Sequence, residues 1–291
     1  MNAFLSQLLA GLAAGGIYAS LALALVMIYR STHHVNFAQG EMAMFSTFVA
    51  SLLLQAGWPY WAAFAATVAI AFATGAAIEG LLIRRLRDAP VLAIVVVFVA
   101  LLVILHSLAG WLFGYAIRSF PSPFPQAAAG YGGGLMSPHQ LGAIGVTLVM
   151  LALIYLFFRY SPLGLAMRAT AENPVSSRLV GVRVNRMLAL GWGLAGAIGA
   201  VAGMMVAPVV FLDVHMMSGV LLYAFAAAVL GGIGSAPGAV VGGFIVGVLE
   251  NLLGTYVVGA ELKLTVALVL IIGVLVARPS GLFGKAVVVR V

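Results

Sequence analysis

The chain has 291 residues, of which 64% are hydrophobic and 7% charged, and its formal net charge is +7. This number of polar side chains is too small to cover a water-facing globule. The composition therefore excludes a soluble protein and predicts an all-α polytopic membrane protein. The absence of Cys excludes a disulfide framework and a thiolate metal site or nucleophile. The basic residues lie at the ends of apolar runs, which indicates a membrane-topology signal and no nucleic-acid partner.

Apolar runs of about 20 residues are long enough to span a bilayer, and they predict nine spanning helices, with eight as the alternative. The last three runs are short enough to be tilted, broken or partly re-entrant. No polar stretch is long enough to form a second domain, so residues 1–291 are expected to form a single transmembrane domain. The runs are 8–29, 37–56, 60–83, 91–113, 141–158, 187–207, 219–232, 239–253 and 262–277.

The basic residues also predict the orientation of the chain. Twelve of the fourteen Lys and Arg residues lie at Arg30 and within 84–87, 159–186 and 278–290. Nine spans with the N-terminus outside place all twelve on the cytoplasmic face and leave only Arg118 and Lys263 outside, as the positive-inside rule requires. The C-terminus is therefore expected in the cytoplasm and the N-terminus in the periplasm.

The basic loop 159–186 contains the signals of a short helix. Asn173 is a good N-cap, Pro174 suits the first helical position and Gly181 suits the position after the last turn. A helix over 174–180 would be amphipathic, and it can lie on the bilayer surface or insert into a groove of a cytoplasmic partner. Its apolar residues are Val175, Leu179 and Val180.

No nucleotide-binding loop is present. The only Gly-Lys pair, Gly284-Lys285, is followed by Ala286 and has Pro279 where a phosphate-binding loop carries its first glycine. If ATP powers this protein, another chain must hydrolyse it.

The segment 231–243 combines glycines with a proline. Pro237 removes a backbone donor and the glycines loosen a helix, so unsatisfied backbone groups near membrane depth must be buried in protein or face a water-filled cavity. Glycines also recur every four residues here and at Gly199 and Gly203, and simple close packing of helices explains that spacing equally well. The candidates for a translocation path in this segment are Gly232, Gly234, Ser235, Pro237 and Gly238.

A third polar segment precedes the second run. Asn36 is expected to cap a helix, with Gln39 reaching back to it as in a capping box. Glu41 follows one turn inside the span, where the helix dipole favours a carboxylate, so a structural role is preferred over a gate. All three residues are nevertheless candidates for the translocation path.

Other carboxylates lie within the runs or at their ends. Glu79 is expected to pair with Arg84, one turn away, whereas Glu250 beside Asn251 is the stronger candidate for an internal or path role. The five histidines show no metal-ligand spacing, so no metal site is expected.

Several motifs occur in order from the first run to the tail, and together they resemble the LivH-type permeases of branched-chain amino acid ABC importers. No single motif is specific, but the combination is. The motifs are Gly15-Gly16-Ile17-Tyr18-Ala19, Asn36-Phe37-Ala38-Gln39-Gly40-Glu41, Ser161-Pro162-Leu163-Gly164 with Arg168-Ala169 and Glu172, Leu230-Gly231-Gly232-Ile233-Gly234-Ser235-Ala236-Pro237-Gly238-Ala239, and Arg278-Pro279-Ser280-Gly281-Leu282-Phe283-Gly284.

The resemblance implies a permease of type II-like importer fold in the bacterial inner membrane, with no enzyme activity and no cofactor of its own. Its partners would be a second permease, LivM-like or identical, two cytoplasmic ATP-binding subunits that use the ATP, and a periplasmic substrate-binding protein that selects a branched-chain or related amino acid. The break at 231–243 would help to form the path. The coupling helix to the ATPase would comprise Glu172, Asn173, Pro174, Val175, Leu179, Val180 and Gly181.

Two other classes remain open. An ion-coupled secondary transporter or channel also uses interrupted helices and intramembrane carboxylates, but it would predict an internal repeat and carboxylates at the centre of the spans. An intramembrane enzyme would need a base near Ser235 or a His-Glu-x-x-His run, and the sequence has neither.

Overall fold

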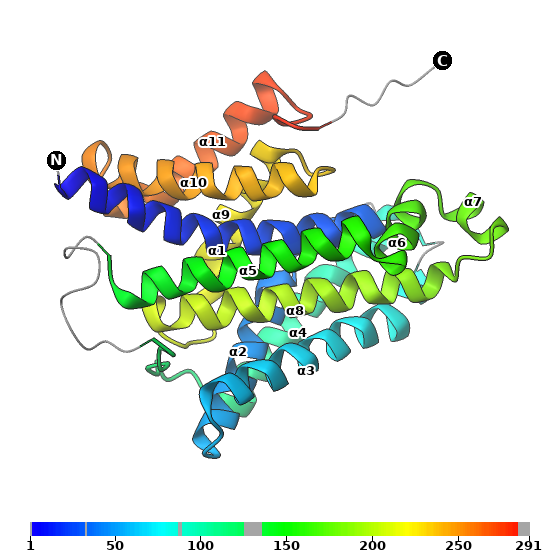
Figure 1. Cartoon of the computed structure of the whole chain (residues 1–291), viewed down its shortest axis with the longest axis horizontal. Helices are drawn as coiled ribbons and strands as arrows, with labels where there is room; N and C mark the ends of the chain where they lie inside the picture. Colours follow the sequence, from blue (N-terminus) through cyan, green and yellow to red (C-terminus); the bar gives the residue numbers. More distant parts are fainter. Residues whose placement is uncertain (1, 33, 87–88, 125–135, 285–291) are drawn as a thin grey trace. The chain divides into compact units, whose positions relative to one another are not determined.

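The computed structural model describes residues 2–32, 34–86, 89–124 and 136–284. Within these ranges the regular structure is helical, apart from one isolated antiparallel bridge between Arg118 and Leu212 (Figure 1). The helices are α1 (Asn2–Thr32), α2 (Gln39–Gln55), α3 (Tyr60–Leu81), η1 (Ile83–Leu86), α4 (Val91–Phe113), α5 (Pro138–Tyr160), α6 (Pro162–Glu172), α7 (Pro174–Leu179), α8 (Val184–Val210), α9 (Met216–Gly231), α10 (Ala236–Tyr256), η2 (Ala260–Leu262) and α11 (Lys263–Ala277).

Each of the nine apolar runs contains a helix, but the helices differ in length. Six are long and apolar enough to cross a membrane within the described ranges: Ala3–Arg30, Tyr60–Leu86, Val91–Phe113, Pro138–Tyr160, Val184–Val210 and Ala236–Tyr256. Helices α2, α9 and α11 have 17, 16 and 15 residues. At about 1.5 Å per residue they are shorter than a hydrocarbon core of about 30 Å. The predicted count of eight or nine spans is therefore not confirmed.

Contacts divide the chain into two compact units. The first comprises Met1–Val26, Phe124–Gly145 and Ser218–Val291, and the second comprises Met27–Pro123 and Val146–Met217. Helices α1 and α5 each contribute to both units. The single transmembrane domain stays a prediction.

In the first unit, α1 and α10 approach so closely that their backbones touch through small residues (Figure 1). A Cβ at Gly15 would lie 2.9 Å from the Cα of Phe244, and a Cβ at Gly247 would lie 2.6 Å from the carbonyl oxygen of Gly11. Gly243 faces Ala19 one turn away. The four-residue spacing of these glycines therefore serves close packing, because only a missing side chain allows this approach.

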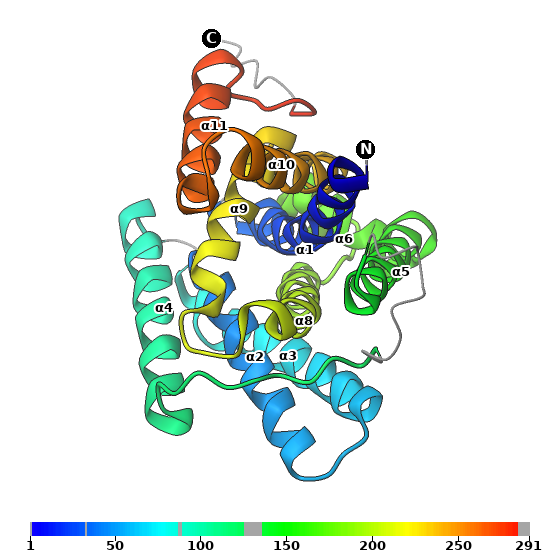
Figure 2. The ribbon, with the colours of Figure 1, turned by 90° about the vertical axis from the view of Figure 1, so that its left-hand side faces the viewer.

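In the second unit, α8 is the central helix, and α2, α3 and α6 pack against it (Figure 2). Small residues again form the contacts, since a Cβ at Gly196 would lie 2.5 Å from the carbonyl oxygen of Ala71 on α3. Gly203 faces Ala43 and Thr47 of α2 in the same way. Most of α8 from Gly191 onward is buried, as expected for a helix that is apolar on every side.

We expect Gly247→Ala to lower the stability of the first unit, because the added methyl group overlaps the backbone of α1. Overpacking of this kind costs about 1–3 kcal/mol, which thermal unfolding of the purified protein in detergent would record as a lower Tm. Gly273→Ala on α11 is the matched control, since nothing lies within 4 Å of that position. Equal melting temperatures for the two variants would contradict the close contact between α1 and α10.

Candidate functional site

The basic loop 159–186 contains two helices rather than one. Helix α6 begins at Pro162 because Ser161 caps it, its hydroxyl oxygen accepting the Leu163 N–H at 3.1 Å. The sequence analysis missed α6, although the pair Ser161-Pro162 carries the same cap and first-position signal as Asn173-Pro174. Applying that rule to both pairs would have found it.

Helix α7 forms at the predicted place. The Asn173 side-chain oxygen accepts the Ser176 N–H at 2.9 Å, and Pro174 occupies the first turn. The helix ends at Leu179 with Val180 as the C-cap, one residue earlier than predicted. Gly181 follows with a φ of +84°, a backbone conformation that favours glycine. The predicted capping signals at both ends are confirmed.

Helix α7 presents its apolar side chains outward. Val175, Leu179 and Val180 are 68%, 83% and 79% exposed, whereas Ser177 on the opposite face is buried. Glu172 and Asn173 are also exposed. A short, firmly capped helix that exposes three large aliphatic side chains has the character of a docking surface.

Helix α2 does not begin as predicted. The Asn36 side-chain oxygen accepts the Ala38 N–H at 3.0 Å, and the N-cap residue, Ala38, makes no side-chain cap hydrogen bond. Gln39 does not reach back to Asn36, because its side-chain amide donates to the carbonyl oxygen of Ala195 at 3.0 Å. The predicted capping box is therefore wrong, since a tertiary partner on α8 takes the side chain that would complete it.

This hydrogen bond also sets the level at which α2 begins. Ala195 is the twelfth of the 27 residues of α8, so the N-terminus of α2 lies level with the middle of a spanning helix. The non-helical segment before it contains Asn36, which is fully buried, as Gln39 is. Irregular backbone at this depth is tolerated only where protein buries it or a water-filled cavity meets it, and transporters place such breaks at their substrate paths.

Glu41, in the first turn of α2, belongs to a polar cluster inside the second unit. One carboxylate oxygen lies 3.3 Å from Nδ1 of His106, and the His106 ring centroid lies 4.9 Å from that of His215. The sequence analysis found no metal-ligand spacing among the histidines and assigned these two no role. An ionisable side chain such as His106 within the apolar run 91–113 was the signal that could have found the cluster. No group of three or more potential metal ligands occurs in the described ranges.

The segment 231–243 is a turn between two helices. Helix α9 ends at Gly231, Gly232 has a φ of +101°, and Ser235 caps α10 by accepting the Gly238 N–H at 3.1 Å. Pro237 lies in the first turn of α10, where a backbone N–H has no partner within the helix. The predicted break is therefore present, between Gly231 and Ala236. Pro237 does not cause a lost hydrogen bond within a helix, because the N–H groups of the first turn have no intrahelical acceptor.

The tail motif 278–284 packs on this turn. The N–H groups of Leu282 and Phe283 donate to the carbonyl oxygens of Leu230 and Gly231, at 2.8 and 3.1 Å. Gly281 adopts a φ of +74°, and a Cβ there would lie 2.5 Å from the Cα of Gly232. Two motifs about 50 residues apart therefore form one backbone junction that satisfies the free carbonyl groups at the end of α9.

Glu250 is buried and paired. Its carboxylate accepts the Tyr18 hydroxyl at 3.4 Å and lies 3.2 Å from the Lys263 ammonium. Asn251 donates to both the backbone and the side-chain oxygen of Gln7, at 2.6 and 2.8 Å. These contacts join α1, α10 and η2–α11, and the sequence analysis anticipated neither Tyr18 nor Lys263 as a partner.

The path candidates of the first unit do not form one site. Glu250 and Asn251 lie toward the C-terminus of α10, about 20 Å along the helix from Ser235 at its N-terminus.

In the second unit, the predicted pair of Glu79 and Arg84 is present, with 3.2 Å between the charged groups.

Long apolar helices, glycine-mediated packing and a helix that begins level with the middle of another are features of a multi-pass membrane protein. The family model described as "Branched-chain amino acid transport system / permease component" matches residues 7–275. The chain therefore belongs to this family of branched-chain amino acid transport permeases, as the resemblance predicted.

Relatives of this chain match it over most of its length. The high-affinity branched-chain amino acid transport system permease protein LivH of Escherichia coli (strain K12) is 33% identical over 99% of this chain and 98% of its own length. The corresponding BraD of Pseudomonas aeruginosa is 32% identical over 99% and 98%. A probable LivH of Methanocaldococcus jannaschii is 28% identical over 91% and 87%.

We expect Gly281→Ala to release the tail from the turn, because the added methyl group overlaps Gly232 and the left-handed backbone costs about 1–2 kcal/mol in any residue with a Cβ. Digestion of the purified protein with a carboxypeptidase should proceed past Phe283 faster in this variant. Gly234→Ala, in the same turn but with open space around it, is the control. Wild-type resistance in Gly281→Ala would show that the junction does not hold the tail.

Proposed function

We propose that the chain is the transmembrane permease subunit of an ABC importer for branched-chain or related amino acids. It would adopt a type II-like importer fold, form the translocation path with a second permease, LivM-like or identical, and be driven by two separate ATPase subunits. A periplasmic binding protein would deliver the substrate. The observation that carries the proposal is the capped helix α7 with three exposed aliphatic side chains, in a chain of the permease family that has no phosphate-binding loop of its own.

The charge pattern supports the placement of this helix in the cytoplasm. The loop 159–186 carries Arg159, Arg168, Arg178, Arg183 and Arg186 and no acidic residue except Glu172. The positive-inside rule puts such a loop on the cytoplasmic face of the inner membrane, where the ATPases would lie. The C-terminus would be cytoplasmic and the N-terminus periplasmic.

The second unit contains a continuous mechanical connection from α7 to the start of α2. The Val182 N–H donates to the carbonyl oxygen of Ser177 at 3.0 Å, which ties the end of α7 to the chain that enters α8 two residues later. Helix α8 in turn binds the start of α2, because the carbonyl oxygen of Ala195 accepts a hydrogen bond from the Gln39 side-chain amide at 3.0 Å. A shift of α7 imposed by a partner would therefore move α8 and, with it, the half-depth end of α2.

The buried end of α2 is the preferred candidate for part of the path. Asn36, Gln39 and Glu41 are buried there, and Glu41 lies against His106. The dipole of a helix N-terminus together with a carboxylate offers groups of both signs to a zwitterionic amino acid. Glu250, with Lys263 and Tyr18 as partners, is assigned a structural role. The turn 232–238 keeps its role as a path candidate at the other end of α10.

An ion-coupled secondary transporter is the second candidate, and the pair of the buried Glu41 and the half-buried His106 is the observation that favours it. The two functions differ in whether the chain transports alone. Affinity purification from the native host in mild detergent, followed by mass spectrometry, tests this directly. Co-purified ATPases and a second permease are the expected result, whereas a chain that purifies alone and transports an amino acid in liposomes would overturn the proposal.

We expect the double substitution Leu179→Asp with Val180→Asp to abolish substrate-stimulated ATPase activity of the reconstituted complex. Two charges on the exposed face of α7 cannot be buried against a partner without a large desolvation cost. Both side chains are about 80% exposed, so membrane insertion and the Tm of the isolated chain should be unchanged. Leu179→Met with Val180→Ile keeps the surface apolar and should retain activity. Wild-type activity in the Asp variant would remove α7 from the coupling interface.

The two buried carboxylates should respond differently to amide substitution. Glu41→Gln is expected to lower amino acid uptake at least several-fold while the complex still assembles. Glu250→Gln is expected to leave Lys263 without its carboxylate and to cost about 1–3 kcal/mol of stability, with uptake per folded complex preserved. Uptake and Tm measured for both variants decide the assignment, and normal uptake in Glu41→Gln would exclude that carboxylate from the path.

A further inference from the structure

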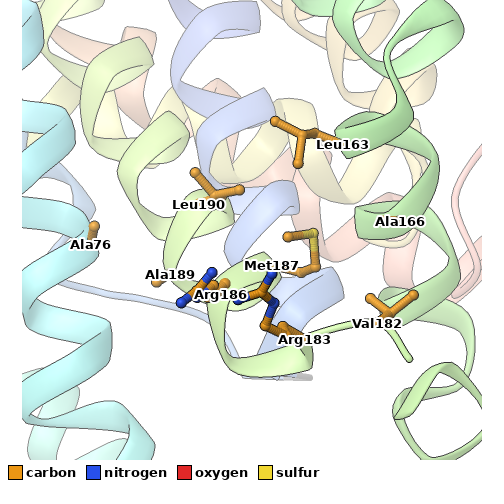
Figure 3. A pocket seen from close by; sticks show the side chains of 9 residues that line it. All are labelled: Ala76, Leu163, Ala166, Val182, Arg183, Arg186, Met187, Ala189 and Leu190. Carbon is orange, nitrogen blue, oxygen red and sulfur yellow. The ribbon is translucent and has the colours of Figure 1, made fainter. Parts of the chain in front are cut away.

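The second unit contains a cavity of about 490 Å³ that the proposed function does not use (Figure 3). It lies between the C-terminal part of α3, the start of α6 and the first turns of α8. Its size is within the range of small-molecule binding pockets. The lining residues are Ala76, Leu163, Ala166, Val182, Arg183, Arg186, Met187, Ala189 and Leu190.

The lining divides sharply by chemistry. Arg183 and Arg186 are its only polar members, and the other seven residues are apolar. Figure 3 shows the two arginine side chains together toward one end of the pocket, with Leu163 toward the other. Both arginines are exposed, and neither guanidinium has a carboxylate partner among the described residues. The cavity thus combines two exposed positive charges with a lining that is otherwise apolar.

The place of the cavity along the helices is equally specific. Ala76 lies near the C-terminus of α3, five residues before Leu81, and the arginines stand at the N-terminus of α8. Both helices are long and apolar enough to cross the membrane. The arginines are therefore at the end of two spans, where lipid headgroups lie, while the apolar wall extends toward the hydrocarbon.

We propose that this pocket binds an anionic phospholipid of the surrounding bilayer. The phosphate would lie against Arg183 and Arg186, and the first part of an acyl chain would cover the apolar wall formed by residues such as Leu163 and Leu190. Basic pockets between spanning helices are suited to such headgroups. The positive end of the α8 dipole adds to the attraction, because the arginines flank the first turn of that helix.

The lining favours a lipid over the other anions that two arginines could bind. A free phosphate would satisfy the arginines but leave seven apolar residues in contact with water. An acidic segment of a protein partner would meet the same difficulty, and the exposed aliphatic residues of α7 that would face such a partner are not part of the lining. An anionic amphiphile matches both halves of the pocket.

The test uses the full-length chain purified in mild detergent and titrated with phosphatidylglycerol, with bound lipid counted by native mass spectrometry. Phosphatidylglycerol is expected to bind, and phosphatidylcholine, whose headgroup has no net charge, to bind far more weakly. Arg183→Gln with Arg186→Gln should weaken phosphatidylglycerol binding about 25-fold, about five-fold for each positive charge removed. Excess inorganic phosphate should not displace the lipid.

The matched control is Arg85→Gln with Arg178→Gln, which removes the same charge from two exposed arginines outside the lining and should leave binding unchanged. Ala189→Leu fills part of the apolar wall without changing the charge and should also weaken binding, and the Tm of each variant identifies misfolding. An equal loss of phosphatidylglycerol binding in both arginine double variants would show that only the net charge of the protein matters, and it would overturn the proposal. Displacement of the lipid by inorganic phosphate would show that the pocket is a site for free anions, which would also overturn the proposal. If Arg183→Gln with Arg186→Gln binds lipid normally but no longer co-purifies with ATPases, the two arginines belong to a protein interface.

Discussion

The structure depends on one constraint of the lipid environment: every backbone N–H and carbonyl group at membrane depth must find a partner inside the protein. Uninterrupted helices meet it without help, and the interruptions meet it through specific residues. At the start of α2, the Asn36 side chain accepts the Ala38 N–H. At the end of α9, the tail supplies the N–H groups of Leu282 and Phe283 to two free carbonyl groups. Each break is thereby stabilised in one conformation.

Close backbone contact is the second feature on which the architecture rests. Lipid tails are as apolar as leucine, so helices in a membrane associate through packing, and glycines allow the closest packing. The contacts of Gly15 with α10, and of Gly196 and Gly203 with α3 and α2, follow this rule. Because α8 contacts α2, α3 and α6 together, it is the element through which a displacement of the loop 159–186 would reach the interior of the second unit.

The three buried carboxylates in the described part of the chain are each paired. Glu41 lies against His106, Glu79 against Arg84 and Glu250 against Lys263. Pairing offsets the cost of burial, so the presence of a carboxylate within a span does not by itself indicate a transport role. What separates Glu41 from the other two is its position at a helix end that lies level with the middle of α8. The proposed lipid pocket, in contrast, lies at the end of the spans, where Arg183 and Arg186 remain exposed.

The short-range features of this protein could be predicted from its sequence. Hydropathy located all nine helical runs, because a lipid-facing helix must be apolar along its length. The caps at Asn173 and Gly181 followed from the backbone conformations that these residue types favour. The pair of Glu79 and Arg84 followed from their separation by about one helical turn. Family membership followed from motifs whose order the whole chain preserves.

Only the tertiary structure decided which distant segments meet. Gln39 satisfied the pattern of a capping box, yet its amide binds Ala195, more than 150 residues away. His106 joins Glu41, and the tail closes the end of α9, through contacts that no local pattern encodes. The physical reason is the same in each case: a residue's type determines which bonds it can make, but packing determines which partner lies within reach.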